Sequence, residues 1–194
     1  MARYYPHDYP KLDEDAINLR IDYGFFEYGI DVFELARYIG MTLIPYSSLS
    51  EEKRSAIKAT NDLNDGFTVM RHSDGGWDFL TYYNDNLPLV RQRFTIAHEI
   101  KHVFYREENS TEKDEALADH FARELLAPSC LVMFLMENHS VSELCNFFNI
   151  SVQATQNAVK SAKSRVKGKG KQLNQYEAEY IDYMKSNKII SRKN

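Results

Sequence analysis

The strongest constraint on the fold is the stretch Leu89–Tyr105, which contains neither glycine nor proline. Its apolar residues recur at helical spacing in two sets, Phe94, Ala97 and Phe104, and Ile96, Ile100 and Val103. Asn86 and Pro88, directly upstream, are typical of a helix start. Because the apolar residues cover more than one side, we predict a largely buried helix whose polar side faces a cleft.

This predicted helix carries His98 and His102 four residues apart, with Glu99 between them. Residues four apart lie one above the other on a helix, so both imidazoles can reach a single metal ion. Glu99 lies about 100° further round the helix, where its carboxylate can meet a water molecule beside the metal. This H-E-x-x-H pattern is typical of zinc-dependent peptidases. The alternative is a pair of unrelated histidines that face solvent.

A second predicted helix, residues 114–128, places Glu115 and Asp119 four apart on one face. A catalytic zinc site takes three protein ligands and keeps one position open, so Glu115 can be the third ligand. Asp119 can then accept a hydrogen bond from the free ring N–H of a ligand histidine. An exposed acidic face at a helix start is the competing interpretation, and the presence of His98 and His102 favours the metal.

Two runs of residues carry a resemblance to a known family: Arg93-Phe94-Thr95-Ile96-Ala97-His98-Glu99-Ile100-x-His102 and Glu115-x-x-x-Asp119-x-Phe121-Ala122-x-x-Leu125-Leu126-Ala127-Pro128. Together with Gly66-Phe67 upstream and residues 141–154 downstream, they resemble the ImmA/IrrE family of metallo-endopeptidases over about residues 29–160. Members are small bacterial proteins, often on phages and mobile elements, that relieve repression by acting on a helix-turn-helix repressor.

The resemblance implies that His98, His102 and Glu115 are the metal ligands and that Glu99 is the catalytic acid/base. One residue departs from the family pattern, which usually has glycine where this chain has Lys101. Lys101 lies between the ligands on the helix and need not touch the metal. It does place a cation near the site, where it can influence Glu99 or the choice of substrate.

The other histidines carry weaker signals. His120 follows Asp119 and can stabilise an oxyanion in a transition state if it reaches the site, which position alone does not show. His7, His72 and His139 are interpreted as surface or loop residues.

Composition excludes several classes of protein. A chain of 194 residues can fill one core, and its formal net charge of −4 argues against a general nucleic-acid binder. Its two cysteines, Cys130 and Cys145, indicate a reducing compartment without a disulfide framework. No apolar run reaches the roughly 18 residues that span a bilayer, and residues 1–7 lack the apolar core of a signal peptide. We therefore predict a cytoplasmic protein without a membrane partner.

The predicted fold class is α+β: a zincin-like metallopeptidase domain with a small β-hairpin or sheet, the catalytic helix, and C-terminal helices. Helices are predicted over 30–40, 48–59 (from a capping box that starts at Ser48) and 129–137, and strands over 41–45, 66–71 and 77–83, listed in chain order. The turn Ser73-Asp74-Gly75-Gly76 joins the last two strands into a hairpin, with Trp77 and Phe79 on one face. An edge strand there can bind an extended substrate by strand addition.

Four segments are predicted: a mostly irregular lead-in (1–28), the metallopeptidase domain (29–139), a helix-turn-helix-like pair (140–164), and a basic linker with a short helix (165–194). If the pair read DNA, the residues facing the groove would be Gln153, Gln156, Asn157 and Lys160. We favour a helical hairpin that packs on the peptidase domain, because such pairs need not bind DNA.

The sequence thus predicts a zinc metallo-endopeptidase (a hydrolase), and the family resemblance implies that it is an anti-repressor whose substrate is a helix-turn-helix repressor. The ligand set favours Zn²⁺ and is compatible with Mn²⁺ or Fe²⁺. The alternative is a non-proteolytic regulator that has a metal site and binds DNA or a repressor. Glu99 argues against a vestigial site, because metal binding alone does not need it. The cleavage site, the trigger and the oligomeric state are not specified by the sequence.

Overall fold

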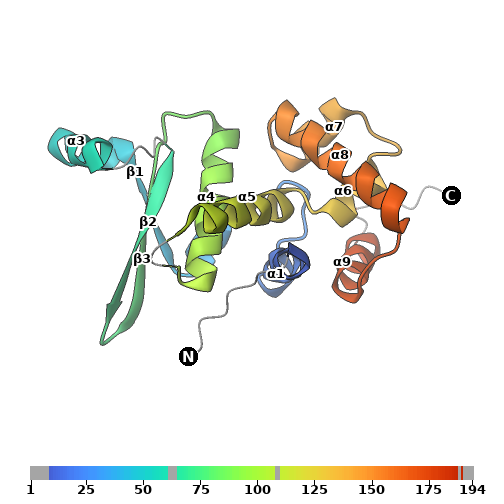
Figure 1. Cartoon of the computed structure of the whole chain (residues 1–194), viewed down its shortest axis with the longest axis horizontal. Helices are drawn as coiled ribbons and strands as arrows, with labels where there is room; N and C mark the ends of the chain where they lie inside the picture. Colours follow the sequence, from blue (N-terminus) through green and yellow to red (C-terminus); the bar gives the residue numbers. More distant parts are fainter. Residues whose placement is uncertain (1–8, 61–64, 108–109, 188, 190–194) are drawn as a thin grey trace. The chain divides into compact units, whose positions relative to one another are not determined.

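The structure, a computed structural model of the chain, describes residues 9–60, 65–107, 110–187 and 189. The chain divides into two compact units (Figure 1). We call Val32–Ala122 the sheet unit. Of the described residues, 9–31 and those from Arg123 onward form the helical unit.

The sheet unit contains all the described strands. In chain order its elements are α2 (Val32–Tyr38), β1 (Met41–Pro45), η1 (Tyr46–Ser48), α3 (Glu51–Thr60), β2 (Gly66–Ser73), β3 (Gly76–Tyr83), α4 (Leu89–Tyr105) and most of α5 (Glu112–Leu126). The strand order is β1-β3-β2, with β1 parallel and β2 antiparallel to β3. The α+β class predicted from the sequence is confirmed.

The predicted hairpin is present, and its strands are slightly longer than expected. Its register pairs Gly66 with Tyr83 and Ser73 with Gly76. Gly76 has a φ of 116°, which only glycine adopts readily, so the tight turn depends on it. The rings of Trp77 and Phe79 stack with centroids 6.2 Å apart, as their predicted common face requires.

Helix α4 packs against α2, β2 and β3, with Ile96, Ala97 and Ile100 completely buried. Its bounds agree with the prediction because an uninterrupted apolar pattern of this length is a strong helix signal. Close packing against β2 depends on Gly66. A Cβ atom there would lie 2.7 Å from Thr95 Cγ2 and 2.7 Å from the Tyr82 carbonyl oxygen.

The start of α3 differs from the prediction. The proposed capping box from Ser48 is wrong, because Ser48 lies in η1 and its hydroxyl donates to the Pro45 carbonyl. The hydroxyl of Ser50 instead accepts a hydrogen bond from Lys53 N. Two serines so close together offer two possible caps, and the preceding 3-10 turn decides between them.

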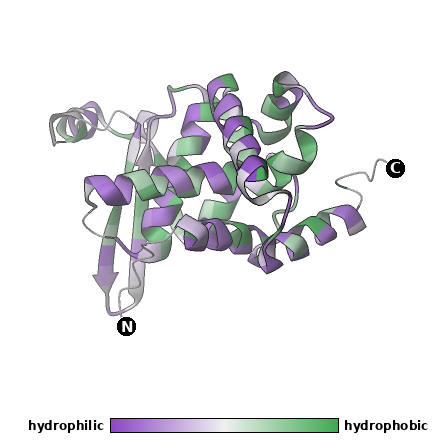
Figure 2. Ribbon diagram, turned by 45° about the vertical axis from the view of Figure 1, so that its right-hand side comes forward, coloured by the Kyte–Doolittle hydropathy of each residue, from purple (hydrophilic) through white to green (hydrophobic). Residues whose placement is uncertain are grey.

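The helical unit consists of α1 (Tyr9–Asp22), the end of α5, α6 (Ser129–Leu135), α7 (Val141–Phe148), α8 (Val152–Lys169) and α9 (Gln175–Ser186). Helix α8 packs on α6 and α7, and α9 packs on α1 and α6. The hydropathy colouring shows that these helices carry both apolar and polar residues around their circumference (Figure 2). The predicted α7 begins with the expected capping box between Ser140 and Glu143.

The expectation of a mostly irregular lead-in is wrong for Tyr9–Asp22, which form α1. Leu12, Ala16 and Leu19 follow a helical spacing and are buried, but charged and aromatic neighbours obscure that pattern in the sequence. Arg20, also buried, donates to the carbonyls of Phe25, Glu27 and Leu125 and thereby orders the chain after the helix. His7 lies outside the described residues.

The basic linker predicted from residue 165 is also partly wrong, because α8 continues to Lys169. Arg165 donates to both carboxylate oxygens of Glu177 on α9, at 2.5 and 2.6 Å. A long-range ion pair of this kind is not visible in local composition, which is dominated here by lysine and glycine. No helix in the described parts of the chain combines the length and the apolar character needed to cross a membrane.

Candidate metal centre

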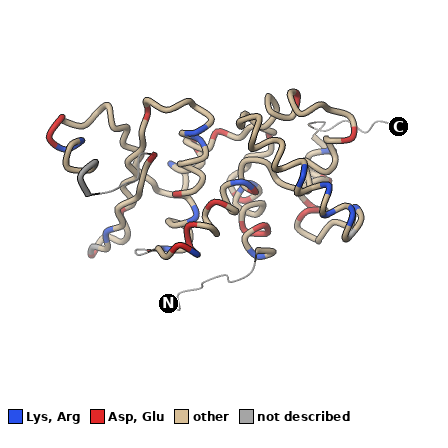
Figure 3. The backbone as a smooth tube through the Cα atoms, turned by 45° about the horizontal axis from the view of Figure 1, so that its top comes forward, with Lys and Arg blue, Asp and Glu red and all other residues tan. Residues whose placement is uncertain are grey.

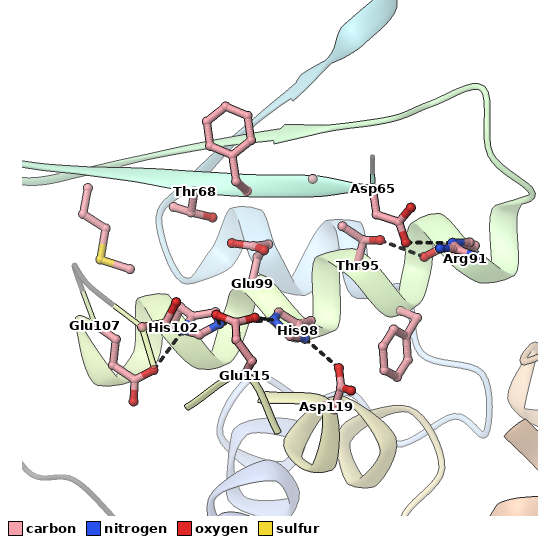
Figure 4. Close-up of a pocket in the computed structure, with 15 residues that line it drawn as sticks. Asp65, Thr68, Arg91, Thr95, His98, Glu99, His102, Glu107, Glu115 and Asp119 are labelled. Atoms are coloured by element: carbon pink, nitrogen blue, oxygen red, sulfur yellow. Dashed lines mark hydrogen bonds and ion pairs between the residues drawn. The ribbon is translucent and has the colours of Figure 1, made fainter. Parts of the chain in front are cut away.

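Three side chains from two helices converge in the sheet unit (Figure 4). His98 and His102 project from α4, and Glu115 projects from the first turns of α5. His98 Nε2 lies 3.2 Å from His102 Nε2 and 3.0 Å from Glu115 Oε2. His102 Nε2 lies 3.6 Å from Glu115 Oε1.

This geometry fits a metal ion. Zinc ligands at about 2.0–2.1 Å in tetrahedral arrangement lie about 3.3–3.4 Å from one another. The three separations in the cluster, 3.0, 3.2 and 3.6 Å, fall on both sides of that value. Two imidazoles and one carboxylate also form the donor set of a catalytic zinc site with one open position.

Asp119 lies beside the ring of His98. His98 Nδ1 lies 3.0 Å from Asp119 Oδ1, and the aspartate side chain is 50% exposed. An ionised carboxylate only accepts hydrogen bonds, so this contact places the proton on Nδ1. Nε2 is then the ring nitrogen that is directed toward Glu115 and His102.

The ring of His102 is held by Glu107, which the sequence analysis did not identify. His102 Nδ1 lies 2.8 Å from Glu107 Oε2, and the glutamate side chain is only 2% exposed. Helix α4 ends at Tyr105. The next residue, Arg106, has a φ of 54°, which reverses the chain and returns Glu107 N to the His102 carbonyl, at 2.9 Å. The left-handed turn at Arg106 thus brings Glu107 beside His102, and the local sequence carries no signal for this turn.

A cavity of about 410 Å³ contains the cluster. It is bounded by β2, by one face of α4 and by the start of α5, with the lining residues Asp65, Gly66, Phe67, Thr68, Met70, Arg91, Phe94, Thr95, His98, Glu99, His102, Glu107, Ser110, Glu115 and Asp119. One wall is thus a strand, and the opposite wall carries His98, His102 and Glu115.

Glu99 faces the same cavity without joining the cluster. Figure 4 shows its carboxylate in the space between α4 and β2, on the Thr68 side. The residue is 7% exposed. The sequence expectation that Glu99 and the histidines serve one site therefore agrees with their placement.

Electrostatics favour the ionised form of Glu115. Burial alone would raise the pKa of this carboxyl, but a hydrogen bond from Ser110 and the nearby His102 and His98 bring its pKa below the ordinary value. Glu115 is therefore available as an anionic ligand at neutral pH.

His120, which follows Asp119 on α5, is not among the described residues that line the cavity. The proposed part of His120 in oxyanion stabilisation therefore gains no support from this geometry.

The comparison with protein families gives a clear result. The family model for the IrrE N-terminal-like domain, peptidase M78, matches residues 27–160. The chain belongs to the peptidase M78 family. The match spans all the cavity-lining residues named above, and it confirms the resemblance to ImmA/IrrE proteins inferred from the sequence motifs.

Membership of the M78 family supports a metallopeptidase-type function that acts on protein, and the histidine–glutamate cluster agrees with metal dependence. No match was found among curated proteins or among solved structures.

Proposed function

We propose that this protein is a zinc-dependent endopeptidase that hydrolyses a peptide bond in a helix-turn-helix transcriptional repressor. The observation that carries the proposal is the convergence of His98, His102 and Glu115 in a cavity that also contains Glu99 and is walled by an outer strand. Membership of the peptidase M78 family supports the same class of reaction.

In this proposal His98, His102 and Glu115 hold Zn²⁺, and Asp119 orients His98. A bound zinc ion supplies Lewis acidity, which polarises a carbonyl group and lowers the pKa of water to about 7. The two-imidazole, one-carboxylate set suits zinc, and Mn²⁺ or Fe²⁺ fits the same ligand types. Metal analysis of the purified protein identifies the native ion.

Glu99 is proposed as the acid/base. Its carboxylate accepts a proton from the water whose oxygen attacks the scissile carbonyl carbon. It then donates that proton to the amide nitrogen as the carbon–nitrogen bond breaks, so the products are a carboxylate and an amine. Its burial beside the cluster keeps it close to the position of the carbonyl group.

Strand β2 supports an extended protein substrate. It is an outer strand of the sheet, and no described strand pairs with its free edge. Gly66, Phe67, Thr68 and Met70 of β2 line the cavity. An extended peptide can add to such an edge through main-chain hydrogen bonds, while side-chain pockets select its residues. The repressor as substrate comes from the family resemblance.

The test is co-expression of the cognate repressor with the wild type or with Glu99→Ala, with metal content measured on both purified proteins. We expect the wild type to cut the repressor, and Glu99→Ala to keep its metal while leaving the repressor whole. If both proteins bind metal, both leave the repressor intact and derepression still occurs, peptide hydrolysis is not the mechanism.

A second candidate function, a non-proteolytic regulator that binds DNA, is favoured by one observation in the helical unit. Lysines gather along α8 (Figure 3), and Lys160, Lys163 and Lys167 line a groove of about 430 Å³. Salt-dependent binding of duplex DNA that Lys160→Ala and Lys163→Ala weaken would support this function. Repressor cleavage that survives these substitutions would instead support the endopeptidase.

A further inference from the structure

A lysine lies among the metal-site residues with its charge completely buried. The side chain of Lys101 is 0% exposed. Its Nζ lies 2.7 Å from Glu107 Oε1, 2.5 Å from Glu107 Oε2 and 3.2 Å from the Asp114 carbonyl oxygen. An ammonium group has three N–H donors and no acceptor, so every donor of Lys101 has a partner.

The first two contacts act on His102 through Glu107. Oxygen Oε2 of Glu107, which accepts from Lys101, also lies 2.8 Å from His102 Nδ1. The carboxylate is therefore fixed between an ammonium group and a ring N–H. As long as Lys101 holds it, the His102 ring keeps its Nε2 directed toward Glu115 and His98.

The third contact acts on Glu115 through the backbone. Asp114 directly precedes Glu115, and its carbonyl belongs to the first turn of α5. A hydrogen bond from Lys101 on α4 therefore ties α4 to α5 at the residue directly before Glu115, the third ligand. Thr111 caps the same turn, because its hydroxyl accepts a hydrogen bond from Asp114 N. Its N–H and hydroxyl also donate to the Asp114 carboxylate.

We propose that Lys101 is a positioning residue that holds two of the three metal ligands in place, His102 through Glu107 and Glu115 through the Asp114 carbonyl. This inference rests on the proposed metal site. It assigns Lys101 a part in metal affinity without contact to substrate or reacting atoms.

The carboxylates that contact the two histidines differ in exposure, which explains why only the partner of His102 needs a buried cation. Asp119, the partner of His98, is 50% exposed, so water can solvate its charge. Glu107, the partner of His102, is 2% exposed and cannot rely on water. A buried carboxylate without a paired cation is strongly unfavourable. Lys101 supplies that cation, and the buried Glu107 depends on it.

The experiment measures the zinc affinity of the full chain by competition with a chelator, for the wild type and for Lys101→Met. Methionine keeps the length of the side chain and removes the charge. We expect zinc to bind Lys101→Met about 10–100-fold more weakly, as for other residues that orient metal ligands. Lys113→Met, which removes an exposed cation one residue before Asp114, is the matched control and should leave the affinity unchanged.

A second control separates positioning from general stability. Leu35→Ala removes a fully buried side chain from α2 in the same unit, so it should lower the urea midpoint of unfolding and keep the zinc affinity. If Lys101→Met lowers the midpoint while its zinc affinity equals that of the wild type, Lys101 only supports packing and the inference is overturned.

If Lys101→Met does not fold, the double variant Lys101→Met/Glu107→Gln carries the test, because it leaves no buried unpaired charge. It should fold and bind zinc about tenfold more weakly than the single variant Glu107→Gln, since only the double variant loses the link to Asp114; equal zinc affinity of these two variants overturns the inference. A wild type that binds zinc but cuts no repressor refutes the endopeptidase and leaves the positioning role standing. A wild type that binds no zinc refutes both.

Discussion

In each unit of this protein a buried glutamate pairs with a lysine or arginine, and the two pairs serve different ends. In the sheet unit Lys101 meets Glu107, with side chains 0% and 2% exposed. In the helical unit Arg165 meets Glu177, with side chains 20% and 3% exposed. Both glutamates accept two hydrogen bonds from their cation at 2.5–2.7 Å.

The difference lies in what else each glutamate touches. Glu107 contacts the ring of His102 at the cavity, whereas Glu177 accepts from Asn174 N, at 2.8 Å, and closes the capping box of α9. Burial of a charge therefore does not identify a functional site. What distinguishes the two sites is the further contact that each glutamate makes. Changes to the Lys101–Glu107 pair should therefore alter metal binding, whereas changes to the Arg165–Glu177 pair should alter stability alone.

Shifted pKa values in the helical unit likewise do not identify a functional site. Burial raises the pKa of the Tyr180 phenol to about 12, and burial raises the pKa of the Cys130 thiol well above its ordinary value. Neither residue is among the described residues that line the metal-site cavity. These pKa shifts result from burial in the core and do not indicate catalytic groups.

The largest effect should come from Glu99→Gln in the sheet unit. Loss of the proposed acid/base should lower the rate of the proposed repressor cleavage by about 10²–10⁴-fold, measured with purified proteins. Zinc content should stay at the wild-type level, because Glu99 is not part of the metal cluster. A variant that loses its zinc along with its activity would show that Glu99 helps to hold the metal.

In the helical unit, Arg165→Met should lower the free energy of unfolding by about 3 kcal/mol, because it leaves Glu177 buried and unpaired. Urea unfolding measures this loss, and the double variant with Glu177→Gln should recover part of it. Zinc affinity and cleavage rate of the folded protein should not change. A loss of zinc affinity here would contradict the division between the two pairs.

Two glycines offer matched clashes, one in each unit. A Cβ on Gly66 would lie 2.7 Å from Thr95 Cγ2, and a Cβ on Gly29 would lie 2.8 Å from the Phe147 carbonyl oxygen. Either change to alanine should cost about 1–3 kcal/mol in unfolding experiments. Gly66→Ala alone should also slow cleavage, because it displaces β2 from α4 at the cavity. Equal cleavage by both variants would show that the β2 wall is not critical.

The smallest effect should come from Ser151→Ala, at the start of α8 in the helical unit. The Ser151 hydroxyl accepts a hydrogen bond from Ala154 N, at 3.1 Å. Its removal should cost about 1 kcal/mol of unfolding free energy, seen as a lower urea midpoint, with cleavage unchanged. Slower cleavage would indicate that the start of α8 takes part in substrate binding.

Much of the sheet unit could be predicted because its signals are local. The span of α4, the hairpin turn and the pairs at four-residue spacing all depend on residues close together in the chain. The same reasoning placed His98, His102 and Glu115 in one site, and the structure brings their donor atoms together. It failed for α1, where charged and aromatic neighbours obscure the helical spacing of the residues that the packing buries.

By itself the sequence determined the family, the α+β class and the identity of the residues that meet in the cluster, because periodicity and motif spacing are properties of short segments. Only the tertiary structure decided that Glu107 orients His102, that Lys101 neutralises it and that β2 walls the cavity. Those contacts require a chain reversal at Arg106 and the packing of α4 on the sheet. The free energy of such long-range contacts comes from burial, which no local pattern encodes.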